Sequence, residues 1–361
     1  MLDLKIAVLL PDLRVGGVEK MRLALAREWK HLGHEVIFIV LRDTGGLLVD
    51  VRRDFIVQSL QAHRMRAAVW KLRGVLLAEK PHLLLVGMWP LTVIGIISAK
   101  LASLGTRVFV SEHISFKHTP ELRTTVGKLL FWFTVTFLYR MTINVICVSE
   151  GVKSDLAIFA KPPAKKLRVI YNPAYVKGKN KNVRQTEKRS TFTILSVGSL
   201  KDQKDHRTLI RAFSYLVPLE SFRLVLVGDG PERLELATLV HEQGLSTFIE
   251  FAGEQLDLAK YFLEADVFVL SSRYEGFANV IVEAMSYGLQ VVSTDCEHGP
   301  REILNGGEYG RLVPVSDARA MAVAIQASLA KPFSVTSIKE RASEYSPLTV
   351  ANQYLKLFGG E

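Results

Sequence analysis

Two glutamates stand eight positions apart in the segment SSRYEGFANVIVEAMSYG, residues 271–288, and a helix is predicted to start between them. Glu275 lies in the preceding loop and Glu283 one turn inside the helix. A carboxylate accepts two hydrogen bonds at once, which suits vicinal hydroxyls. The positive helix end and its first backbone amides favour a phosphate. These amides belong to Phe277, Ala278, Asn279 and Val280. The segment fits a ligand with hydroxyls on both sides of a diphosphate, or two acids that the helix dipole stabilises by about 0.3–1 kcal/mol each.

Two glycine-containing loops after predicted strands add candidates for an anion site. In RVGGVE the paired glycines Gly16 and Gly17 precede a helix and let a ligand approach the backbone. In SVGSLKDQKDH, residues 196–206, Lys204 is placed to neutralise a leaving diphosphate. Each loop also has a plain interpretation. The first fits a tight turn, and the second fits solvated lysines before an N-cap at Asp205.

Several cofactor sites are disfavoured by the sequence. The loop GDGPER has Arg233 where the dinucleotide motif needs a third glycine, which disfavours a nicotinamide site. An ordinary turn, with Pro231 at the first helical position, explains the loop. The two carboxylates near residue 280 have no third acid and no histidine or cysteine cluster that would complete a metal site. Cys147 and Cys296 lack CxxC spacing, which favours a reducing compartment over a disulfide scaffold or zinc site.

The elements that position these loops alternate between strand and helix along almost the whole chain, which is typical of parallel sheets covered on both faces. The 361 residues are enough for two cores. We predict a doubly wound domain over 1–172, a polar basic linker over 173–190, a second doubly wound domain over 191–345, and a final helix over 346–361 that packs back on the first domain. The two domains are expected to face each other across a cleft, with ligands at the carboxyl ends of the strands.

Charge is distributed unevenly along the chain. Residues 1–185 carry a net +16 and residues 186–361 a net −6, which together give +10. A basic half fits nucleic acid, an anionic membrane or a phosphate-bearing substrate. No aromatic-basic binding motif supports nucleic acid. The basic residues Arg64, Arg66, Lys71 and Arg73 lie near Trp70 and could contact anionic lipid.

Two hydrophobic stretches approach the length of a membrane span. Residues 83–99 are interrupted by Gly87 and Pro90, and residues 128–148 by Arg140. We therefore predict no transmembrane helix. The segment LLFWFTVTFLY fits either a membrane-surface contact or a helix buried in the core. The N-terminal run after Lys5 is too short for a signal peptide and predicts a first strand.

The segment from Glu275 to Glu283 resembles the E-x7-E motif of glycosyltransferase family four, which are retaining enzymes of the GT-B fold. Further matching motifs follow one another along nearly the whole chain. They are GGVE near the N-terminus, SEH at 111–113, CVSEGVKSDL at 147–156, YNP at 171–173, VGSLKDQKDH, LVLVGDGPER and GPREIL at 299–304. Several motifs in the same order are far more specific than any one of them.

The resemblance implies a role for each matching residue. Glu275 would hold hydroxyls of the donor sugar, Glu283 would bind the ribose, and Lys204 would stabilise the leaving diphosphate. The amides of residues 277–280 would support the sugar and the diphosphate. His113 would face the donor sugar. The remaining donor-side candidates are Gly16, Gly17, Glu19, Gly198 and Ser199.

One position departs from the family pattern. Many relatives have arginine in the motif G-R-L-x-x-x-K where this chain has Ser199. Serine can donate a hydrogen bond but carries no charge. Either Lys201 replaces the missing charge, or Lys204 bears the diphosphate contact alone.

The resemblance then implies a retaining, metal-independent transferase that moves a hexose or an N-acetylhexosamine from a UDP-sugar to a hydroxyl. The implied acceptor is a polyprenyl-linked glycan at the cytoplasmic face of the cell membrane, to which the protein would bind peripherally. No cofactor is implied, because lysine and a helix terminus do the work of a divalent ion. Two alternatives are a nucleotide-sugar epimerase of the same architecture and a catalytically silent binding subunit of a membrane glycan-assembly complex, which only Ser199 favours.

Overall fold

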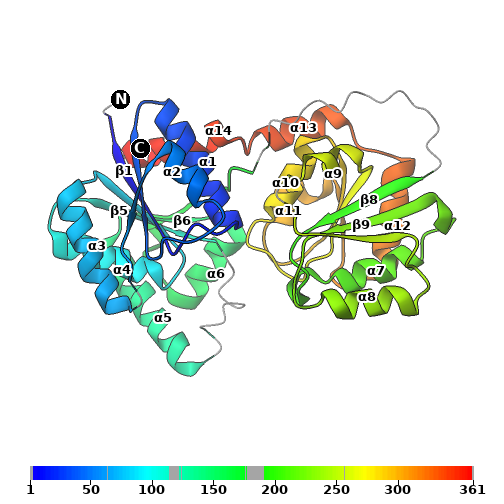
Figure 1. Ribbon diagram of the computed structural model, residues 1–361, viewed down its shortest axis with the longest axis horizontal. Coiled ribbons are helices and arrows are strands. Elements are labelled where there is room, and N and C mark those ends of the chain that lie inside the picture. The colour runs from blue at the N-terminus through cyan, green and yellow to red at the C-terminus, as the bar shows by residue number, and fades with distance from the viewer. Residues whose placement is uncertain are drawn as a thin grey trace. The chain divides into compact units, whose positions relative to one another are not determined.

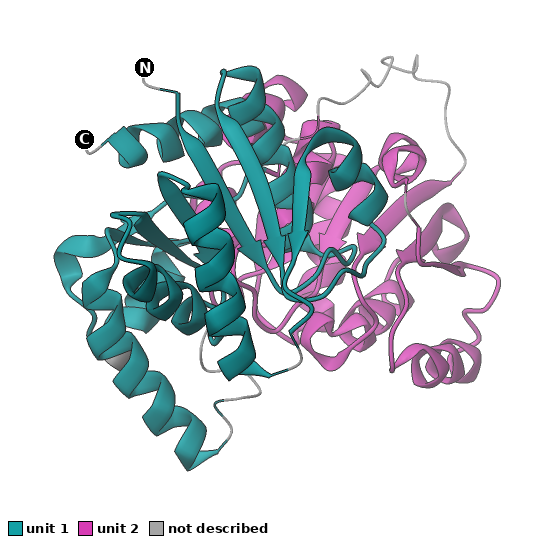
Figure 2. Ribbon diagram, turned by 60° about the vertical axis from the view of Figure 1, so that its left-hand side comes forward, with its two compact units in different colours: residues 1–173, 347–361 teal, residues 174–346 magenta. Residues whose placement is uncertain are grey.

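The computed structural model describes residues 3–62, 64–113, 122, 124–174, 176, 191–255 and 257–359. The chain forms two compact units, one of residues 1–173 with 347–361 and one of residues 174–346 (Figure 2). Each unit contains one parallel sheet covered by helices on both faces, which confirms the predicted class of two doubly wound α/β domains. Most of the predicted linker at 173–190 lies outside the described residues.

The N-terminal unit is built on a seven-stranded parallel sheet with the order β3-β2-β1-β4-β5-β6-β7. The strands are β1 (Lys5–Leu10), β2 (Glu35–Val40), β3 (Ile56–Ser59), β4 (Leu83–Gly87), β5 (Arg107–Glu112), β6 (Asn144–Cys147) and β7 (Leu167–Val169). The helices are α1 (Gly17–His31), α2 (Leu48–Asp54), α3 (Met65–Glu79), α4 (Leu91–Ala102), α5 (Thr125–Leu138), α6 (Glu150–Ala160) and α14 (Pro347–Gly359). The central strands are continuous apolar runs because helices cover both of their faces.

Helices α1 and α14 share one face of this sheet, and α3, α4 and α5 lie on the other (Figure 1). Trp29 of α1 is fully buried, and its ring centroid lies 5.7 Å from those of Tyr354 and Phe358 in α14. The indole nitrogen of Trp29 also donates to the backbone oxygen of Ala351 at 3.3 Å. The last helix of the chain therefore completes the core of the first domain.

The C-terminal unit is built on a six-stranded parallel sheet with the order β10-β9-β8-β11-β12-β13. The strands are β8 (Phe192–Val197), β9 (Phe222–Val227), β10 (Ile249–Gly253), β11 (Val267–Leu270), β12 (Gln290–Thr294) and β13 (Arg311–Val313). The helices are α7 (His206–Ser214), α8 (Arg233–Glu242), α9 (Ala259–Glu264), α10 (Asn279–Ser286), α11 (Pro300–Ile303), α12 (Ala318–Ala330) and α13 (Val335–Ser343). Helices α7, α8 and α12 bury one face of the sheet in a single core.

The structure corrects the sequence analysis in two details, and it contradicts a wholly buried helix at the aromatic segment. Helix α8 begins at Arg233, so Pro231 lies in the turn before it and not at the first helical position. The short edge strands β3, β7 and β13 were not predicted. Helix α5 is not wholly buried, because one of its faces is exposed. Within the ranges given above, no helix combines the length and the hydropathy needed to cross a bilayer.

Candidate active site

The predicted donor-side residues of the C-terminal unit lie where the strand order of the sheet reverses. Strand β8 pairs with β9 on one side and with β11 on the other. The loops after β8 and β11 therefore leave the sheet in different directions, and such a switch point is where doubly wound sheets bind ligands. The two loops are joined by hydrogen bonds. The Ser271 Oγ donates to the Lys204 carbonyl at 2.7 Å, and the Gln203 side chain donates to the Tyr274 carbonyl at 2.9 Å.

Lys204 and Glu275 form an ion pair at this switch point. The Lys204 Nζ lies 2.6 Å from Oε1 of Glu275, and Ser272 Oγ donates to the same oxygen at 2.7 Å. Glu275 is only 8% exposed. The lysine stem runs across Gly198, where an added Cβ would lie 3.2 Å from its Cε. Gly198 therefore leaves room for Lys204, and one oxygen of Glu275 is fully engaged by the protein.

Asp205 fixes the turn that follows Lys204. It has a left-handed backbone conformation, with φ of 46°, and caps α7 by accepting from the backbone and hydroxyl of Thr208 at 3.3 and 2.9 Å. Ser316 donates to the same carboxylate at 3.0 Å, and the Arg273 Nε lies 3.3 Å away from it. These contacts hold the ammonium group of Lys204 at one place beside the sheet.

Ser199 lacks the positive charge of the arginine in the family pattern, and the nearby Lys201 is the candidate to supply it. Ser199 is exposed and uncharged, but Lys201 lies close enough to Lys204 for the two cations to interact. Partial burial, and then Lys204, lower the pKa of Lys201 below its usual 10.5. Burial, followed by Lys204, lowers the pKa of His206 to about 4. His206 is therefore neutral near pH 7, and the positive charge of the loop is carried by the two lysines.

Helix α10 begins at Asn279, where the sequence predicted it. Ala278 precedes it with a φ of 67° and, as an alanine, has no side chain that could cap the helix. Gly299, with φ of 92°, approaches the carbonyl of Phe277 so closely that any Cβ would overlap it. The Phe277 ring is buried against Tyr345. Glu283 is half-buried one turn further along the helix.

The glycine loop of the N-terminal unit follows β1. Gly16 is the N-cap of α1, and a Cβ at this position would overlap the carboxylate of Glu19. Gly17 is the first residue of the helix. Burial raises the pKa of Glu19 above its usual range, although a hydrogen bond from its own backbone amide lowers it in part. The carboxylate of Glu19 thus lies against the backbone of Gly16, in space that any side chain at this position would fill.

His113 follows β5 and is 6% exposed. Its Nε2 lies 2.9 Å from Ser111 Oγ and 3.4 Å from Nη2 of Arg22. Burial, and second the Arg22 guanidinium, lower the pKa of His113 well below its usual 6.5, so the ring is neutral. Arg22 and Ser111 were not predicted as site residues. The signal for Arg22 was its place on the apolar stripe of α1 at helical spacing from Leu25 and Trp29.

The opposite face of β5 carries a separate buried polar group. Tyr139 donates to Oε1 of Glu112, and Thr92 Oγ1 lies 3.0 Å from the Tyr139 hydroxyl. Burial raises the pKa of Glu112 to about 7, in spite of the opposing effect of the Tyr139 hydrogen bond. No group of three His, Cys, Asp or Glu side chains that could hold a metal occurs among the residues that the structure describes.

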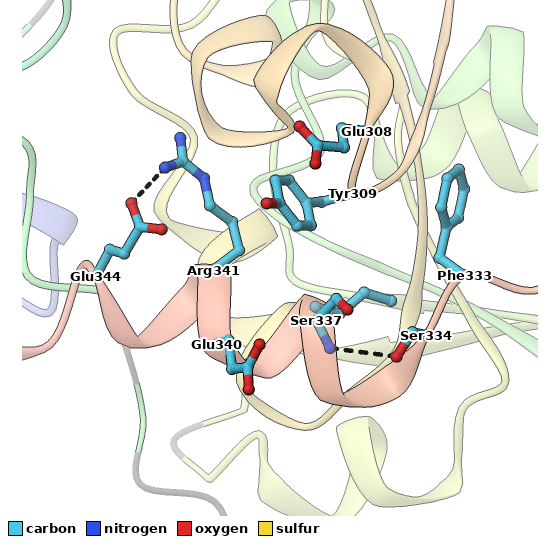
Figure 3. Close-up of a pocket in the computed structure, with 9 residues that line it drawn as sticks. Glu308, Tyr309, Phe333, Ser334, Ser337, Glu340, Arg341 and Glu344 are labelled. Atoms are coloured by element: carbon cyan, nitrogen blue, oxygen red, sulfur yellow. Dashed lines mark hydrogen bonds and ion pairs between the residues drawn. The ribbon is translucent and has the colours of Figure 1, made fainter.

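A cavity of about 410 Å³ lies elsewhere in the C-terminal unit, between α13 and the segment around Tyr309 (Figure 3). Arg341 packs over the Tyr309 ring at 5.9 Å and pairs with Glu344, and the Ser337 amide donates to Ser334 at 3.4 Å. None of the predicted site residues lines this cavity.

Comparison with known proteins adds a second line of observation. A model described as Glycosyltransferase Family 4 matches residues 15–175, and one described as Glycosyl transferases group 1 matches residues 191–331. The N-acetylgalactosamine-N,N'-diacetylbacillosaminyl-diphospho-undecaprenol 4-alpha-N-acetylgalactosaminyltransferase of Campylobacter jejuni is 27% identical over 267 residues, 73% of this chain and 72% of that protein. The lipopolysaccharide core biosynthesis glycosyltransferase LpsE of Rhizobium meliloti is 35% identical over 173 residues, 46% of this chain and half of that protein. Among solved structures, Anabaena HepE in complex with UDP and glucose superposes with a TM-score of 0.80 at 19% identity, covering 99% of this chain and 100% of that one.

Proposed function

Because the chain belongs to the GT-B glycosyltransferases of family four, we propose that it transfers a hexose or an N-acetylhexosamine from a UDP-sugar to a hydroxyl of a lipid-linked glycan, with retention of configuration and without a metal. The observation that carries this proposal is the Lys204–Glu275 pair, held at the switch point of the C-terminal sheet.

The charges at this switch point suit a sugar diphosphate. Lys204 and Lys201 supply positive charge beside the start of α10, whose dipole also favours an anion. Glu275 has one oxygen bound by Lys204 and Ser272, while no described residue donates to its second oxygen. That oxygen is available to sugar hydroxyls. Glu283, further along α10, is placed for the ribose in this proposal.

In the proposed mechanism Glu275 is not a nucleophile, and its carboxylate holds hydroxyls of the sugar. The bond between the anomeric carbon and the departing phosphate oxygen breaks as the acceptor oxygen bonds to that carbon. The departing phosphate oxygen takes the acceptor proton on the same face of the sugar. Lys204 and the helix start stabilise the negative charge that develops on the diphosphate.

The identities of donor and acceptor rest on relatives. The name of the Campylobacter jejuni relative states transfer of N-acetylgalactosamine to a sugar carried on diphospho-undecaprenol, and HepE was solved with UDP and glucose. A radiolabelled UDP-sugar incubated with bacterial lipid extract should give labelled lipid. A donor converted to another sugar without an acceptor would indicate an epimerase instead, and no turnover of any UDP-sugar would indicate a silent binding subunit.

The role of Glu283 is tested by calorimetry of UDP binding. Glu283→Ala should weaken binding by about 10- to 100-fold, which is the loss expected for hydrogen bonds to a charged group. Glu242→Ala, at the exposed end of α8, removes an equal charge from a residue outside the predicted site and should leave the affinity unchanged. Equal affinities for the wild type and Glu283→Ala would refute the ribose contact.

Binding to an anionic membrane is supported by the outer face of α5, which consists of Val126, Leu129, Leu130, Phe133 and Phe137. These side chains lie at helical spacing and are between 43% and 77% exposed. The sequence from 122 to 149 contains three basic residues and no acidic one. An apolar exposed helix face among cations is typical of a helix that lies in the membrane interface. Free, buried cysteines fit the proposed location at the cytoplasmic side of that membrane.

Sedimentation with vesicles tests the membrane contact. The wild type should sediment with phosphatidylglycerol vesicles at low salt, and the double variant Leu130→Glu/Phe133→Glu should not. Leu234→Glu is a matched control, because Leu234 is a highly exposed leucine on α8 of the other domain. If the wild type stays in the supernatant, the membrane part of the proposal is wrong.

A further inference from the structure

Arg22 is a buried cation for which the described structure provides no carboxylate. Its side chain lies inside the N-terminal domain and is 1% exposed. Its Nη2 donates to Ser111 Oγ, and its Nη1 donates to the Tyr354 hydroxyl at 3.4 Å. Burying a charge without an opposite charge costs folding free energy, so such a residue is a candidate for a functional role. The third group beside the guanidinium is the ring of His113.

The hydrogen-bond chemistry of these groups determines which nitrogen of His113 carries the proton. Arginine can only donate, so the Nε2 that faces Nη2 of Arg22 at 3.4 Å must be an acceptor. Ser111 Oγ accepts from Arg22 and has one proton left, which it can donate to Nε2 at 2.9 Å. Both contacts therefore favour the tautomer with the proton on Nδ1. Gly87 makes room for this group, since a Cβ there would lie 3.0 Å from Ser111 Oγ.

The protonated nitrogen has no acceptor in the described part of the protein. The Nδ1 atom of His113 is buried and makes no hydrogen bond there. A buried donor without a partner is rare and costs free energy until an acceptor arrives. His113 directly follows the carboxyl end of β5, which is the edge of a parallel sheet where ligands bind.

We propose that Arg22 and Ser111 are positioning residues, which fix His113 in the Nδ1–H tautomer so that this N–H donates to an oxygen of the bound substrate. The identification of that oxygen as a sugar hydroxyl rests on the proposed function. The tautomer itself does not. Tyr354 joins the same chain of contacts, so α14 also helps to hold the guanidinium in place.

Nitrogen NMR of the full-length protein with ¹⁵N-labelled histidine tests the tautomer. His113→Gln identifies the signals of His113 by their loss. The wild type should show a protonated Nδ1 and an unprotonated Nε2. Ser111→Ala and Arg22→Met should each shift the ring towards the other tautomer, whereas Arg22→Lys retains a donor and should resemble the wild type. A protonated Nε2 in the wild type would overturn the proposal, as would a tautomer that ignores both substitutions in folded protein.

Kinetics separate positioning from a general structural role. Ser111→Ala should lower kcat/KM by about tenfold, through the loss of one aligned hydrogen bond to substrate. In the His113→Gln background the same Ser111→Ala substitution should cost nothing further, because it acts only through His113. Independent, multiplicative losses would contradict the proposal. If the protein proves to have no transferase activity, the NMR result alone decides on the tautomer, while the function proposed above fails.

Discussion

Lys204 pairs with Glu275 and is the cation that would contact a bound diphosphate. We predict that Lys204→Met lowers kcat by about 10²–10³, the loss typical of removing one group that stabilises transition-state charge. Lys201→Met should cost about tenfold or less, because Lys201 makes no ion pair with Glu275. Initial rates at saturating donor measure both. If Lys201→Met is the more damaging substitution, Lys201 has taken over the role of the arginine that relatives have at Ser199.

Glu112 makes the stability of the N-terminal domain depend on pH. Its pKa is about 7 in the folded protein and has its ordinary value near 4.5 when unfolded. The folded state thus keeps a proton that the unfolded state loses. The stabilising contribution is complete below pH 4.5 and disappears as the pH rises to 7. Relative to Glu112→Gln, the wild type should lose about 3 kcal/mol of unfolding free energy across this interval.

Urea denaturation of the wild type and Glu112→Gln at pH 5 and pH 8 measures this difference. The stability of the variant relative to the wild type should be higher at pH 8 than at pH 5, because glutamine keeps an acceptor for Tyr139 and has no proton to lose. The same difference in midpoint at both pH values would show that Glu112 is ionised in the folded state.

At this scale the sequence indicated the residues of the donor loops but not their partners. The motif spacing singled out Glu275 and Lys204, and both lie at adjacent strand ends because β8 and β11 pair. The association of Arg22, Ser111 and Tyr354 depends on sheet order and on a helix more than 300 residues along the chain. No local pattern contains that information. The one sequence signal was the charged Arg22 on the otherwise apolar stripe of α1.

At the scale of elements, the start of α10 is shaped by the loop after β12. Gly299→Ala should weaken UDP binding by about tenfold or more, because its Cβ would push the Phe277 carbonyl and the amides next to it. Gly244→Ala is a matched control, since Gly244 also has a positive φ, of 68°, but open space around its Cα. Both should lose stability through backbone strain, and only Gly299→Ala should lose affinity. Calorimetry of UDP binding would contradict this if the two variants behaved alike.

Helices and central strands could be predicted because their signals are local. The start of α10 at Asn279 and the stop of α1 before Gly33 follow from helix periodicity and glycine conformation. The edge strands β3, β7 and β13 have three or four residues and are only partly buried. They exist because a neighbouring strand offers hydrogen bonds, which is a property of the sheet and not of their own sequences.

At the scale of the whole molecule, α14 should stabilise the domain at the opposite end of the chain. Phe358 is fully buried against Trp29 and Phe109. Phe358→Ala should cost about 3–5 kcal/mol of the stability of the N-terminal domain. Scanning calorimetry with and without UDP tells the domains apart, because a ligand raises only the transition of the domain that binds it. The transition insensitive to UDP should fall, and a fall in the UDP-sensitive one would contradict the assignment.

The two-domain organisation could be predicted because the alternation of strands and helices stops and restarts. The final helix was predicted to pack back on the first domain, but the side chains that it contacts there could not be named from its own sequence. Its apolar stripe would suit any open sheet face, and the choice depends on the fit of Trp29, Tyr354 and Phe358 to one another. Such a fit of side chains arises only once distant segments have met.

The position of α14 also affects how the protein is made. A ribosome that has finished β7 must still translate the whole second domain before the last helix emerges, which takes roughly ten to forty seconds. Throughout that time the nascent first domain displays an uncovered apolar sheet face around Trp29. We expect chaperones to shield this surface during synthesis, and the first domain to reach its native state only after the second has been translated.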